Sequence, residues 1–547
     1  MKKLTIMLLL FYPLLSYTQT WQWAKKAIGT GLDSGEDIIS DMNGNVYIAG
    51  RYSGTSLNFG NTTISNVSGL DFDFYLAKFD ANGNNLWAVG GGGQSRDEAY
   101  SVSTDASGNV YMAGNFKSQT ILIGNTTLVR SQLYDIFIAK FSSSGTLMWA
   151  KSFGGTGNDY IGGICTDKNN NVYLTGNFGS DTIAFGSSTL VNVNCCFGDI
   201  FLAKLDSSGN AKWAISAGGT VSDIGTAISS DNNGNIYLAS AFDSPSIVVG
   251  NSTYVCQGFS DMFVSKVDTS GNIKWVQSFS SPGDEIPFSI ASDQAGNVYL
   301  TGFYWISPIT FGTTTLANAG DQDMFLVKMD SSGGVLWANG AGGPNRDRGF
   351  GVDVDAAGNV FVGGDFLSQN MNFGSTQVNN SSGSEEIFIG KYDSGGGLTW
   401  ASTISGANVD NLHGLATTGN GSLLVSGSFV SPNLTFGSQT LNASGSIDLF
   451  LAKLSANTGI NETLGQKQLR IYPNPVTETF KLIFDNSIQD IDMLIENVLG
   501  QIVTVIPDAT QDMFSVKEMK LVPGVYFLTL TKDSEQLANC KFIVTNE

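Results

Sequence analysis

Residues 101–150 read SVSTDASGNVYMAGNFKSQTILIGNTTLVRSQLYDIFIAKFSSSGTLMWA, and this stretch decides the fold. Short runs rich in β-branched, aromatic and other apolar residues occupy 101–105, 110–114, 135–140 and 147–150, and Gly, Asn and Ser lie between them. Gly and Asn tolerate the positive φ that a tight hairpin needs. The stretch therefore predicts four antiparallel strands, with a longer variable segment between the second and the third.

The same pattern recurs seven times, and four markers keep one register through all the copies. Tryptophans of the fourth run recur every 62 to 64 residues, at Trp23, Trp87, Trp149, Trp213, Trp275, Trp337 and Trp400. The second run closes at Gly50, Gly114, Gly176, Ser240, Gly302, Gly364 and Gly427. An FG element in the variable segment has its glycine at Gly60, Gly124, Gly186, Gly250, Gly312, Gly374 and Gly437, and it predicts a small extra hairpin on the rim. The third run ends at Lys78, Lys140, Lys204, Lys266, Lys328, Lys391 and Lys453. Such self-similarity is the signature of a repeat fold.

The second and third runs are apolar on both faces. Val110 and Met112 point one way, and Tyr111 and Ala113 point the other. A strand of this kind is covered on both sides, as it is in a β-propeller, where each blade is sandwiched between its neighbours. Helical solenoids are excluded because no segment of the repeat has a 3.6-residue period.

The two ends of the array are complementary. Trp23 has no third run before it, and the last third run, 448–453, has no tryptophan run after it. The N-terminal strand is therefore expected to complete the last blade and to remove two free sheet edges. The predicted fold is all-β: a seven-bladed propeller of four-stranded blades over residues 19–455, closed by the N-terminal strand, followed by a small Ig-like β-sandwich.

The repeats resemble the bacterial β-propeller (SBBP-type) repeat. The matching residues are Gly154-Gly155-Thr156-Gly157-Asn158-Asp159, Ile164, Asp167, Asn171-Val172-Tyr173 and Asp199 to Lys204. The resemblance covers roughly residues 20 to 455. It implies an extracellular scaffold and no particular reaction.

The chain begins with the features of a secretory signal peptide. Lys2 and Lys3 precede an apolar stretch from Leu4 to Leu15, too short to span a bilayer well, and small residues follow. We expect residues 1–18 to be removed by cleavage between Thr18 and Gln19. No later segment is apolar and long enough to cross a bilayer, so the mature chain is expected to have no transmembrane segment.

Residues 456–467 form a polar linker, and the composition changes over 468–547, where seven short strand-like runs suggest a sandwich. This segment is similar to the type A C-terminal sorting domain of the type IX (Por) secretion system. The similarity rests on Tyr472-Pro473-Asn474-Pro475, Leu499-Gly500-Gln501, Pro523-Gly524-Val525-Tyr526 and Lys541 to Val544. It implies handling by the type IX machinery, and a protein that is secreted or attached to the outer surface of a Gram-negative bacterium.

Composition limits the partners. The chain has 28 basic and 48 acidic side chains, a formal net charge of -20, which repels nucleic acid and anionic lipid. No residue pattern calls for a cofactor. Of five cysteines, Cys196 and Cys256 lie in the same variable segment of neighbouring repeats, and either a disulfide or free thiols are expected there.

Two charged positions recur in every copy. The acids Asp33, Asp97, Asp159, Asp223, Glu285, Asp347 and Asp410 could form a ring that holds a cation in the central channel, or could cap the turn into each inner strand. Because sites usually break symmetry, capping is the favoured interpretation. The seven lysines are expected between blades, each paired with an aspartate or a backbone carbonyl. The DxxGN turns, such as 293–297, lack the alternating oxygens of a calcium loop and are predicted to be β-turns.

Two single residues depart from the repeat. His413, the only histidine, leaves a Ser-His-Asp arrangement formally open, but it aligns with Tyr100, Phe288 and Phe350 and is expected to fill an aromatic slot. Trp305 leads into the rim insertion of one blade, and either contacts a sugar or protein ligand or packs locally.

No catalytic or metal site is predicted. The function expected is a non-catalytic binding or adhesion scaffold for an unknown extracellular glycan or protein. The alternative is an extracellular hydrolase or lyase with its site at the channel mouth. That alternative needs polar residues gathered in one or two blades, and the unusual Arg346, Arg348, Cys195-Cys196 and Trp305 lie in different repeats.

Overall fold

The structure is a computed structural model of the 547-residue chain. It describes residues 20–456 and 469–545, apart from 68, 70, 195, 196, 473, 485–490, 498–500, 510–512, 533 and 534. The chain divides into two units, and the boundary lies between residues 457 and 458. The predicted signal peptide with Thr18 and Gln19, and the predicted linker beyond residue 456, lie outside the described residues.

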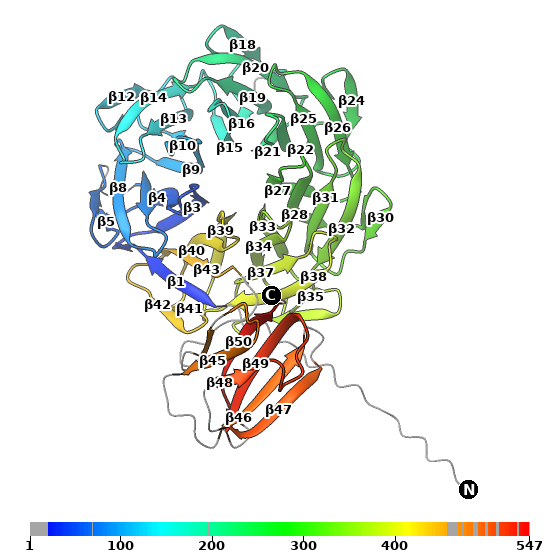
Figure 1. Ribbon diagram of the computed structural model, residues 1–547. Helices are drawn as coiled ribbons and strands as arrows, with labels where there is room; N and C mark the ends of the chain where they lie inside the picture. Colours follow the sequence, from blue (N-terminus) through cyan, green and yellow to red (C-terminus); the bar gives the residue numbers. More distant parts are fainter. Residues whose placement is uncertain are drawn as a thin grey trace. The chain divides into compact units, whose positions relative to one another are not determined.

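Each blade of the first unit is a four-stranded antiparallel sheet, and the second blade shows the plan (Figure 1). From the centre outward it consists of β9 (Asp97–Thr104), β10 (Val110–Phe116), β13 (Asp135–Phe141) and β14 (Leu147–Phe153). Every residue of β10 and β13 is buried, because neighbouring blades cover both faces.

Five further blades keep this order. Their strands are β3 (Asp33–Ser40), β4 (Val46–Tyr52), β7 (Asp73–Phe79) and β8 (Asn85–Gly92) in the first; β15 (Asp159–Thr166), β16 (Val172–Phe178), β19 (Asp199–Leu205) and β20 (Ala211–Ala217) in the third; β21 (Asp223–Ser230), β22 (Ile236–Phe242), β25 (Asp261–Val267) and β26 (Ile273–Phe279) in the fourth; β27 (Glu285–Ser292), β28 (Val298–Trp305), β31 (Gln322–Met329) and β32 (Val335–Ala341) in the fifth; β33 (Asp347–Val354), β34 (Val360–Phe366), β37 (Glu386–Tyr392) and β38 (Leu398–Ile404) in the sixth.

The seventh blade closes the ring. It contains β39 (Asp410–Thr417), β40 (Leu423–Phe429) and β43 (Asp448–Leu454), and its outer strand is the N-terminal β1 (Trp21–Lys26). Trp23 is the register partner of Lys453, and the Ser455 amide donates a hydrogen bond to the Thr20 carbonyl at 2.9 Å. The prediction of seven blades closed by the N-terminal strand is confirmed, and Figure 1 shows β1 beside β43.

The FG elements form the hairpins expected on the rim, and these hairpins also join blades. They are β5 (Ser56–Asn58) with β6 (Thr63–Ser65), β11 (Thr120–Ile123) with β12 (Thr126–Val129), β17 (Thr182–Phe185) with β18 (Ser188–Val191), β23 (Ser246–Val249) with β24 (Ser252–Val255), β29 (Ile309–Phe311) with β30 (Thr314–Leu316), β35 (Asn370–Phe373) with β36 (Thr376–Asn379), and β41 (Asn433–Phe436) with β42 (Gln439–Asn442). The hairpin of the second blade pairs through β11 with β8 of the first. At the closing blade, β2 (Ile28–Gly29) follows β1 and pairs with β5.

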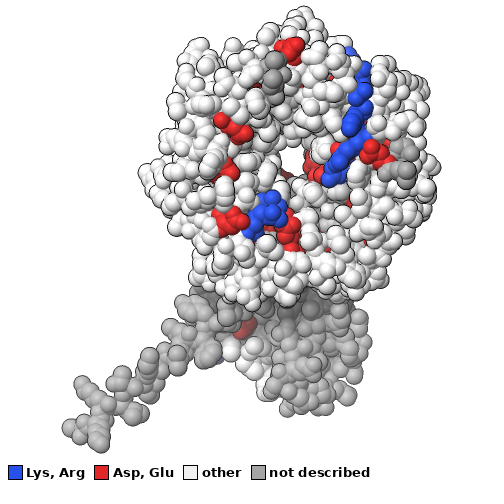
Figure 2. All heavy atoms as spheres, turned by 180° about the vertical axis from the view of Figure 1, so that it is seen from behind, with Lys and Arg blue, Asp and Glu red and all other residues white. Residues whose placement is uncertain are grey.

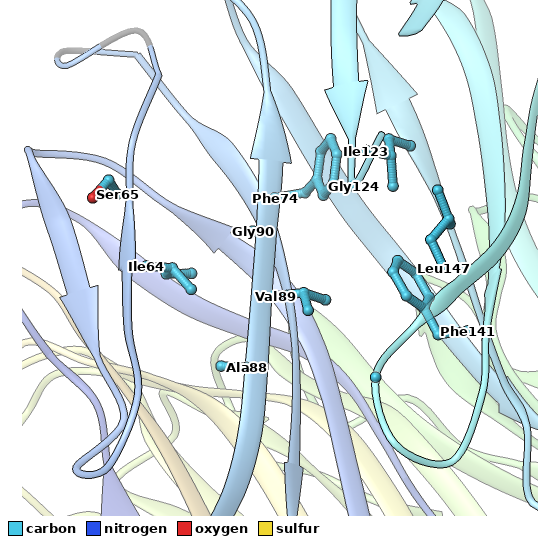
Figure 3. Close-up of a pocket in the computed structure, with 11 residues that line it drawn as sticks. Ile64, Ser65, Phe74, Ala88, Val89, Gly90, Ile123, Gly124, Phe141 and Leu147 are labelled. Carbon is cyan, nitrogen blue, oxygen red and sulfur yellow. The ribbon is translucent and has the colours of Figure 1, made fainter. Parts of the chain in front are cut away.

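A hydrophobic cavity lies where successive rim hairpins approach the same outer strand (Figure 3). Its volume is about 290 Å³, and its walls include Ile64, Phe74, Ile123 and Leu147. Ser65 is the one polar side chain among the residues that line it. We therefore treat this cavity as incomplete packing between hairpins and not as a ligand site.

The tryptophan and lysine markers bind the same atom of the next blade. Trp87 Nε1 and Lys78 Nζ both donate to the carbonyl of Ser143, at 3.2 and 3.0 Å. That carbonyl lies in the turn between the third and fourth strands of the second blade. At the closing blade, Trp23 and Lys453 make the same contacts with the Ala81 carbonyl, at 3.0 and 3.3 Å. These hydrogen bonds explain why both residue types recur.

The second unit is a β-sandwich. One sheet contains β44 (Leu469–Tyr472), β45 (Thr479–Phe484) and β48 (Met513–Ser515); the other contains β47 (Ile502–Ala509), β46 (Ile491–Asn497), β49 (Gly524–Lys532) and β50 (Glu535–Val544). Phe480, Met493, Leu528 and Phe542 are among the residues of its buried core. The seven strands expected from the sequence are present.

Candidate functional site

The seven repeated acids are structural. Each is fully buried, with 0% exposure, and does not line the central channel. Asp97 shows their role: it accepts hydrogen bonds from the amides of Gly93, Lys117 and Ser118 and from the Ser118 hydroxyl. The functional alternative, a carboxylate ring that holds a cation in the channel, is wrong, because the side chains point into the junctions between blades.

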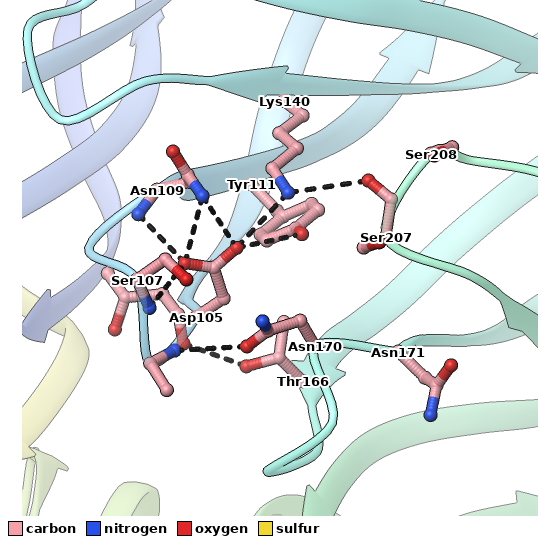
Figure 4. Close-up of polar contacts among 12 residues, drawn as sticks. Asp105, Ser107, Asn109, Tyr111, Lys140, Thr166, Asn170, Asn171, Ser207 and Ser208 are labelled. Carbon is pink, nitrogen blue, oxygen red and sulfur yellow. Dashed lines mark hydrogen bonds and ion pairs between the residues drawn. The ribbon is translucent and has the colours of Figure 1, made fainter.

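Six of the seven repeated lysines donate to a backbone carbonyl as expected, whereas Lys391 lies over the Phe361 ring; Figure 4 shows Lys140. Lys140 Nζ lies 3.1 Å from Asp105, donates to the Ser207 carbonyl of the next blade at 3.3 Å, and sits 4.7 Å from the centre of the Tyr111 ring. Asp105 also accepts hydrogen bonds from the amides of Ser107 and Asn109, which closes the DxxGN turn. The carboxylate oxygens are used by these donors, so the turn is a β-turn as predicted.

The inner strands line a central channel of about 510 Å³. At the carboxyl ends of these strands, hydroxyl groups link successive blades in a repeated way. Thr166 donates to the Thr104 carbonyl at 2.8 Å, Ser230 to the Thr166 carbonyl at 2.8 Å, and Ser292 to the Ser230 carbonyl at 3.0 Å. This end of the channel departs from the repeat at Asp353, whose carboxylate accepts hydrogen bonds from the Thr417 amide and hydroxyl at 2.6 and 2.9 Å.

The other end of the channel, which we call the mouth, breaks the repeat. The position three residues after each repeated acid lines the channel there, and it is Glu36, Tyr100, Gly162, Thr226, Phe288, Phe350 and His413 around the ring. His413 thus takes the slot that the alignment predicted. Charged and aromatic side chains fill most of the mouth, and small ones occupy blades three and four.

Charged residues gather beside the mouth in blades one and two. Glu98 is held by Arg96 through two contacts, at 2.7 and 2.8 Å, by Arg51 at 2.5 Å, and by the Tyr100 hydroxyl at 2.8 Å. Arg51 also pairs with Glu36 at 3.1 Å. Burial alone would raise the pKa of Glu98, but the Arg96 hydrogen bonds and the Arg51 charge outweigh burial and hold this pKa below its usual value.

The charged residues continue through blades six and seven. Arg348 lies 3.4 Å from Asp365 and 3.9 Å from Glu385, and Arg346 also pairs with Glu385. Asn411 of blade seven donates to Asp365 at 2.8 Å. We call the whole set the charged arc: Arg346, Arg348, Asp365, Glu385, Asn411, His413, Glu36, Arg51, Arg96 and Glu98. Figure 2 shows basic and acidic atoms together beside the central opening, on a face that is otherwise mostly uncharged.

His413 connects the two halves of the arc. Its Nε2 lies 3.2 Å from the Ser428 hydroxyl, and its Nδ1 lies 3.7 Å from Glu36. The order Ser, His, carboxylate is that of a hydrolase triad. The distance of 3.7 Å is too long for a hydrogen bond, and Glu36 is already paired with Arg51, so the arrangement falls short of an assembled triad.

The aromatic residues of the mouth stack on one another. Phe288 and Phe350 have ring centres 4.7 Å apart and planes at 15°. Phe303 packs against Phe288, and the Arg348 guanidinium lies 4.9 Å from the Phe350 centre. The faces of Phe288 and Phe350 are therefore in contact with neighbouring side chains.

Trp305, the predicted ligand contact, is half-buried at the end of β28. Its ring packs 6.2 Å from Phe259, which is 67% exposed and precedes β25 of the neighbouring blade. Ile306 follows with φ of 65°, which is unusual for a β-branched residue. The structure thus makes Trp305 part of an aromatic surface pair and does not bring it into the charged arc.

The cysteine predictions are partly outside the described residues. Cys165 and Cys256 are free thiols among the residues that the structure describes, and Cys256 Sγ lies 3.5 Å from the Gly258 carbonyl. Cys195 and Cys196 lie outside, so the pairing of Cys196 with Cys256 stays a prediction.

Residues that the sequence analysis singled out in the second unit form hydrogen bonds within it. Asn474 accepts a hydrogen bond from the Ile543 amide at 2.9 Å, and the Tyr526 hydroxyl donates to the Val522 carbonyl at 2.8 Å across the turn that contains Gly524. Tyr472 is 70% exposed, and Pro475 is exposed beside it. Pro473 and Gly500 lie outside the described residues.

Sequence reasoning missed most of the charged arc. It singled out Arg346, Arg348 and His413, but not Glu36, Arg51, Arg96 and Glu98, nor the acids of blade six. The usable signal was variation at shared positions of the repeat. Arg51 and Asp365 occupy one such position, Arg96 and Arg346 a second, and Glu98 and Arg348 a third, and most other copies carry a neutral residue at each of them.

The topology defines the first unit as a seven-bladed β-propeller, and the family comparison defines the second. Residues 470–545 match the family described as "Secretion system C-terminal sorting domain" (Por_Secre_tail). This domain marks the chain for secretion or for the outer surface of a Gram-negative bacterium, through the type IX system. Among the described residues, no helix has the length and apolar character of a membrane span.

Two curated relatives are similar to parts of this chain. An uncharacterized WD repeat-containing protein L264 of Acanthamoeba polyphaga mimivirus is 23% identical over 518 residues, which covers 76% of this chain and 36% of the relative. The regulatory protein FlaEY of Caulobacter vibrioides is 24% identical over 385 residues, covering 65% of this chain and 38% of the relative. The chain spans little more than a third of the length of these relatives.

Solved structures with similar folds have low identity. Sqt1 from Chaetomium thermophilum has a TM-score of 0.36 and 10% identity, covering 80% of this chain and 100% of that one. YCF48 bound to D1 peptide has a TM-score of 0.35 and 10% identity, covering 80% of this chain and 97% of that one. Such values add nothing to the strand topology, on which the fold rests.

Proposed function

We propose that the chain is an SBBP-type propeller that serves, after type IX export, as a non-catalytic binding or adhesion scaffold for an extracellular glycan or protein. The observation that carries this proposal is the charged arc. Its members come from four consecutive blades in ring order, six, seven, one and two, and they gather at one mouth of the channel. A purely structural repeat protein has no need of such asymmetry.

Binding is favoured over catalysis because the charges of the arc are already paired. Glu98 is neutralised by two arginines, and Asp365 is held by Arg348 and Asn411. Paired charges of this kind present oriented donors and acceptors to a ligand without a free nucleophile or base. Trp305 and Phe259 add an aromatic contact elsewhere on the surface.

The test compares binding by the wild type with binding by two matched double variants. Arg96→Ala with Arg346→Ala removes two arc arginines whose side chains are 40% and 37% exposed. Lys212→Ala with Lys274→Ala removes two 49% exposed lysines that pair with turn aspartates. On a glycan array and a panel of extracellular proteins, the arc variant is expected to lose at least tenfold in affinity, and the lysine variant to bind as the wild type does. Equal binding by both variants would exclude the arc.

The second candidate function is a hydrolase, favoured by the Ser428–His413–Glu36 order. A fluorophosphonate probe and a panel of ester substrates test it directly. Labelling of the wild type that disappears in Ser428→Ala would establish the hydrolase and overturn the scaffold proposal. The proposal expects no labelling that depends on Ser428.

A further inference from the structure

Two buried carboxyl groups meet at each junction between neighbouring blades. One begins the third strand of a blade, and the other is the repeated acid that begins the first strand of the next blade. The pairs are Asp73 with Asp97, Asp135 with Asp159, Asp199 with Asp223, Asp261 with Glu285, Asp323 with Asp347, Glu386 with Asp410, and Asp448 with Asp33. Every member is at most 1% exposed. The sequence analysis identified only one acid of each pair.

The junction between blades five and six shows how the two groups differ. Asp347 accepts hydrogen bonds from the Ser368 amide at 3.1 Å and the Ser368 hydroxyl at 2.7 Å, one on each oxygen. Asp323 accepts one from the Ala319 amide on Oδ2, and its Oδ1 is buried without a partner. Gly342 packs against Asp323 Oδ1, and the next residue, Gly343, packs against Ser368, the hydrogen-bond partner of Asp347, so the two carboxyl groups flank one short segment. Both oxygens of Asp347 therefore accept hydrogen bonds, as expected of an ionised carboxylate, whereas only one oxygen of Asp323 does.

The same asymmetry recurs along the ring. At the six junctions from blade one to blade seven, the unpartnered buried oxygens belong to the third-strand acids: Oδ1 of Asp73, Asp135, Asp199, Asp261 and Asp323, and Oε2 of Glu386. The closing junction is reversed, because both oxygens of Asp33 are buried without a partner while Asp448 accepts hydrogen bonds from Ser444 and Gly445.

The junction leaves little space for a metal ion. A Cβ added to Gly342 would lie 1.9 Å from Asp323 Oδ1, and one added to Gly92 would lie 2.2 Å from Asp73 Oδ1, so the glycine backbone already packs on these oxygens. No group of three or more potential metal-ligating side chains exists among the described residues. Two neighbouring carboxyl groups that are buried away from water favour the un-ionised form of one of them unless a cation is bound, and a proton is the smallest cation.

We propose that the junctions between blades one and two and between blades five and six each bind one proton, held mainly by the third-strand acid, Asp73 or Asp323. The closing junction is left out because Lys26 lies 3.6 Å from Asp448 and supplies a positive charge there. The propeller is therefore assembled around buried acids that are un-ionised in mildly acidic solution.

The pKa shifts at these two junctions agree with this assignment: burial raises the pKa of Asp73 to about 7 and that of Asp97 to about 6. Burial and the charge of Asp347 raise the pKa of Asp323 to about 7, and burial raises the pKa of Asp347 to about 6 against the hydrogen bonds of Ser368. The other titratable groups that act on this pair are Asp321 and Tyr304, and neither is a cation. Both folded pKa values lie above 3.8, the ordinary value. The stabilisation is thus complete below that value and is lost as the pH rises through about 7.

Asp323→Asn tests the proposal, because an amide has the shape of the protonated carboxyl group and its Nδ2 can donate to Asp347. In the full chain we expect the Tm of Asp323→Asn to equal that of the wild type at pH 5 and to exceed it by a few degrees at pH 8. Asp347→Asn should lower the Tm at both pH values, since it disturbs a carboxylate held by several donors. Asp330→Asn is the control: this exposed turn aspartate lies in the same blade, and its pKa is lowered by the Ser332 hydroxyl. It should leave the profile between pH 5 and 8 unchanged.

Two outcomes would overturn the proposal. One is a lower Tm for Asp323→Asn than for the wild type at pH 8, which would show that the ionised carboxylate is preferred. The other is a rise in wild-type Tm with millimolar calcium that Asp323→Asn abolishes, which would show a metal at the junction. Infrared spectroscopy gives a readout independent of stability: the carbonyl band of un-ionised acids should be present at pH 6, fade by pH 8.5, and be weaker in Asp323→Asn than in the wild type.

Discussion

The turn between the third and fourth strands depends on one glycine in each copy. Gly333 has a φ of 88°, and a Cβ added there would lie 3.0 Å from the Trp275 ring of the preceding blade. The glycine is needed for two reasons: its left-handed backbone, and the flat contact with the tryptophan. Two glycines in the chain allow these reasons to be separated.

Gly333→Ala should destabilise the propeller by ~2–3 kcal/mol, because it combines left-handed strain with a steric conflict against Trp275. Gly383 has a φ of 75° and open space around its Cβ position, so Gly383→Ala should cost only ~1–2 kcal/mol. Urea unfolding of both variants measures the difference. Equal costs would mean that contact with the tryptophan is unimportant.

The indole hydrogen bond of the fourth strand has a natural control as well. Trp337 Nε1 donates to the Ser394 carbonyl at 3.2 Å, whereas Trp400 Nε1 is buried without a partner. Trp337→Phe should lose about 1 kcal/mol more stability than Trp400→Phe, since only the first removes a satisfied hydrogen bond. Thermal unfolding of the two variants decides this. The opposite order would show that the shared carbonyl contributes little.

At the scale of elements, the rim hairpins seal the blade junctions. Phe311 of β29 is fully buried, with its ring centre 4.9 Å from that of Phe279 in the outer strand β26 of the preceding blade and 5.3 Å from that of Phe325 in β31 of its own. The FG element is thus part of the hydrophobic core.

Phe311→Ala should therefore cost ~3–5 kcal/mol, the usual range for a buried phenylalanine. Leu122, on the rim hairpin of blade two, is 50% exposed, and Leu122→Ala should change stability by less than about 0.5 kcal/mol. Denaturant midpoints of both variants give the comparison. A mild effect of Phe311→Ala would indicate that the hairpins fold independently of the blade junctions.

The strands were readable from the sequence, and the mouth was not. Period-two runs with Gly-Asn turns identify strands locally, and the register of Trp23 and Lys453 even identifies the closing blade. The charged arc needs more, because Asp365 and Glu98 belong to repeats far apart in the chain. Alignment of the repeats predicts how far along the channel each residue lies. The ion pairs between side chains also depend on rotamers and burial, which the repeat pattern does not predict.

At the scale of the whole molecule, stability depends on the closing blade. Without β1, strand β43 would present an unpaired edge, and such edges associate with other chains. A chain that lacks residues 20–27 should therefore form dimers or larger species in size-exclusion chromatography. Adding a synthetic peptide of residues 20–27 should restore the monomer. If the truncated chain is monomeric and does not bind the peptide, six complete blades are stable without the closing strand.

The pairing of Trp23 with Lys453 also means that the ring can close only late in synthesis. Strand β1 is synthesised first, but its partner β43 lies at the far end of the domain. Strand β1 therefore stays unpaired until nearly the whole domain has been synthesised. Such a chain is poorly suited to finishing its fold early. This delay favours a protein that has to reach a different compartment before it becomes rigid.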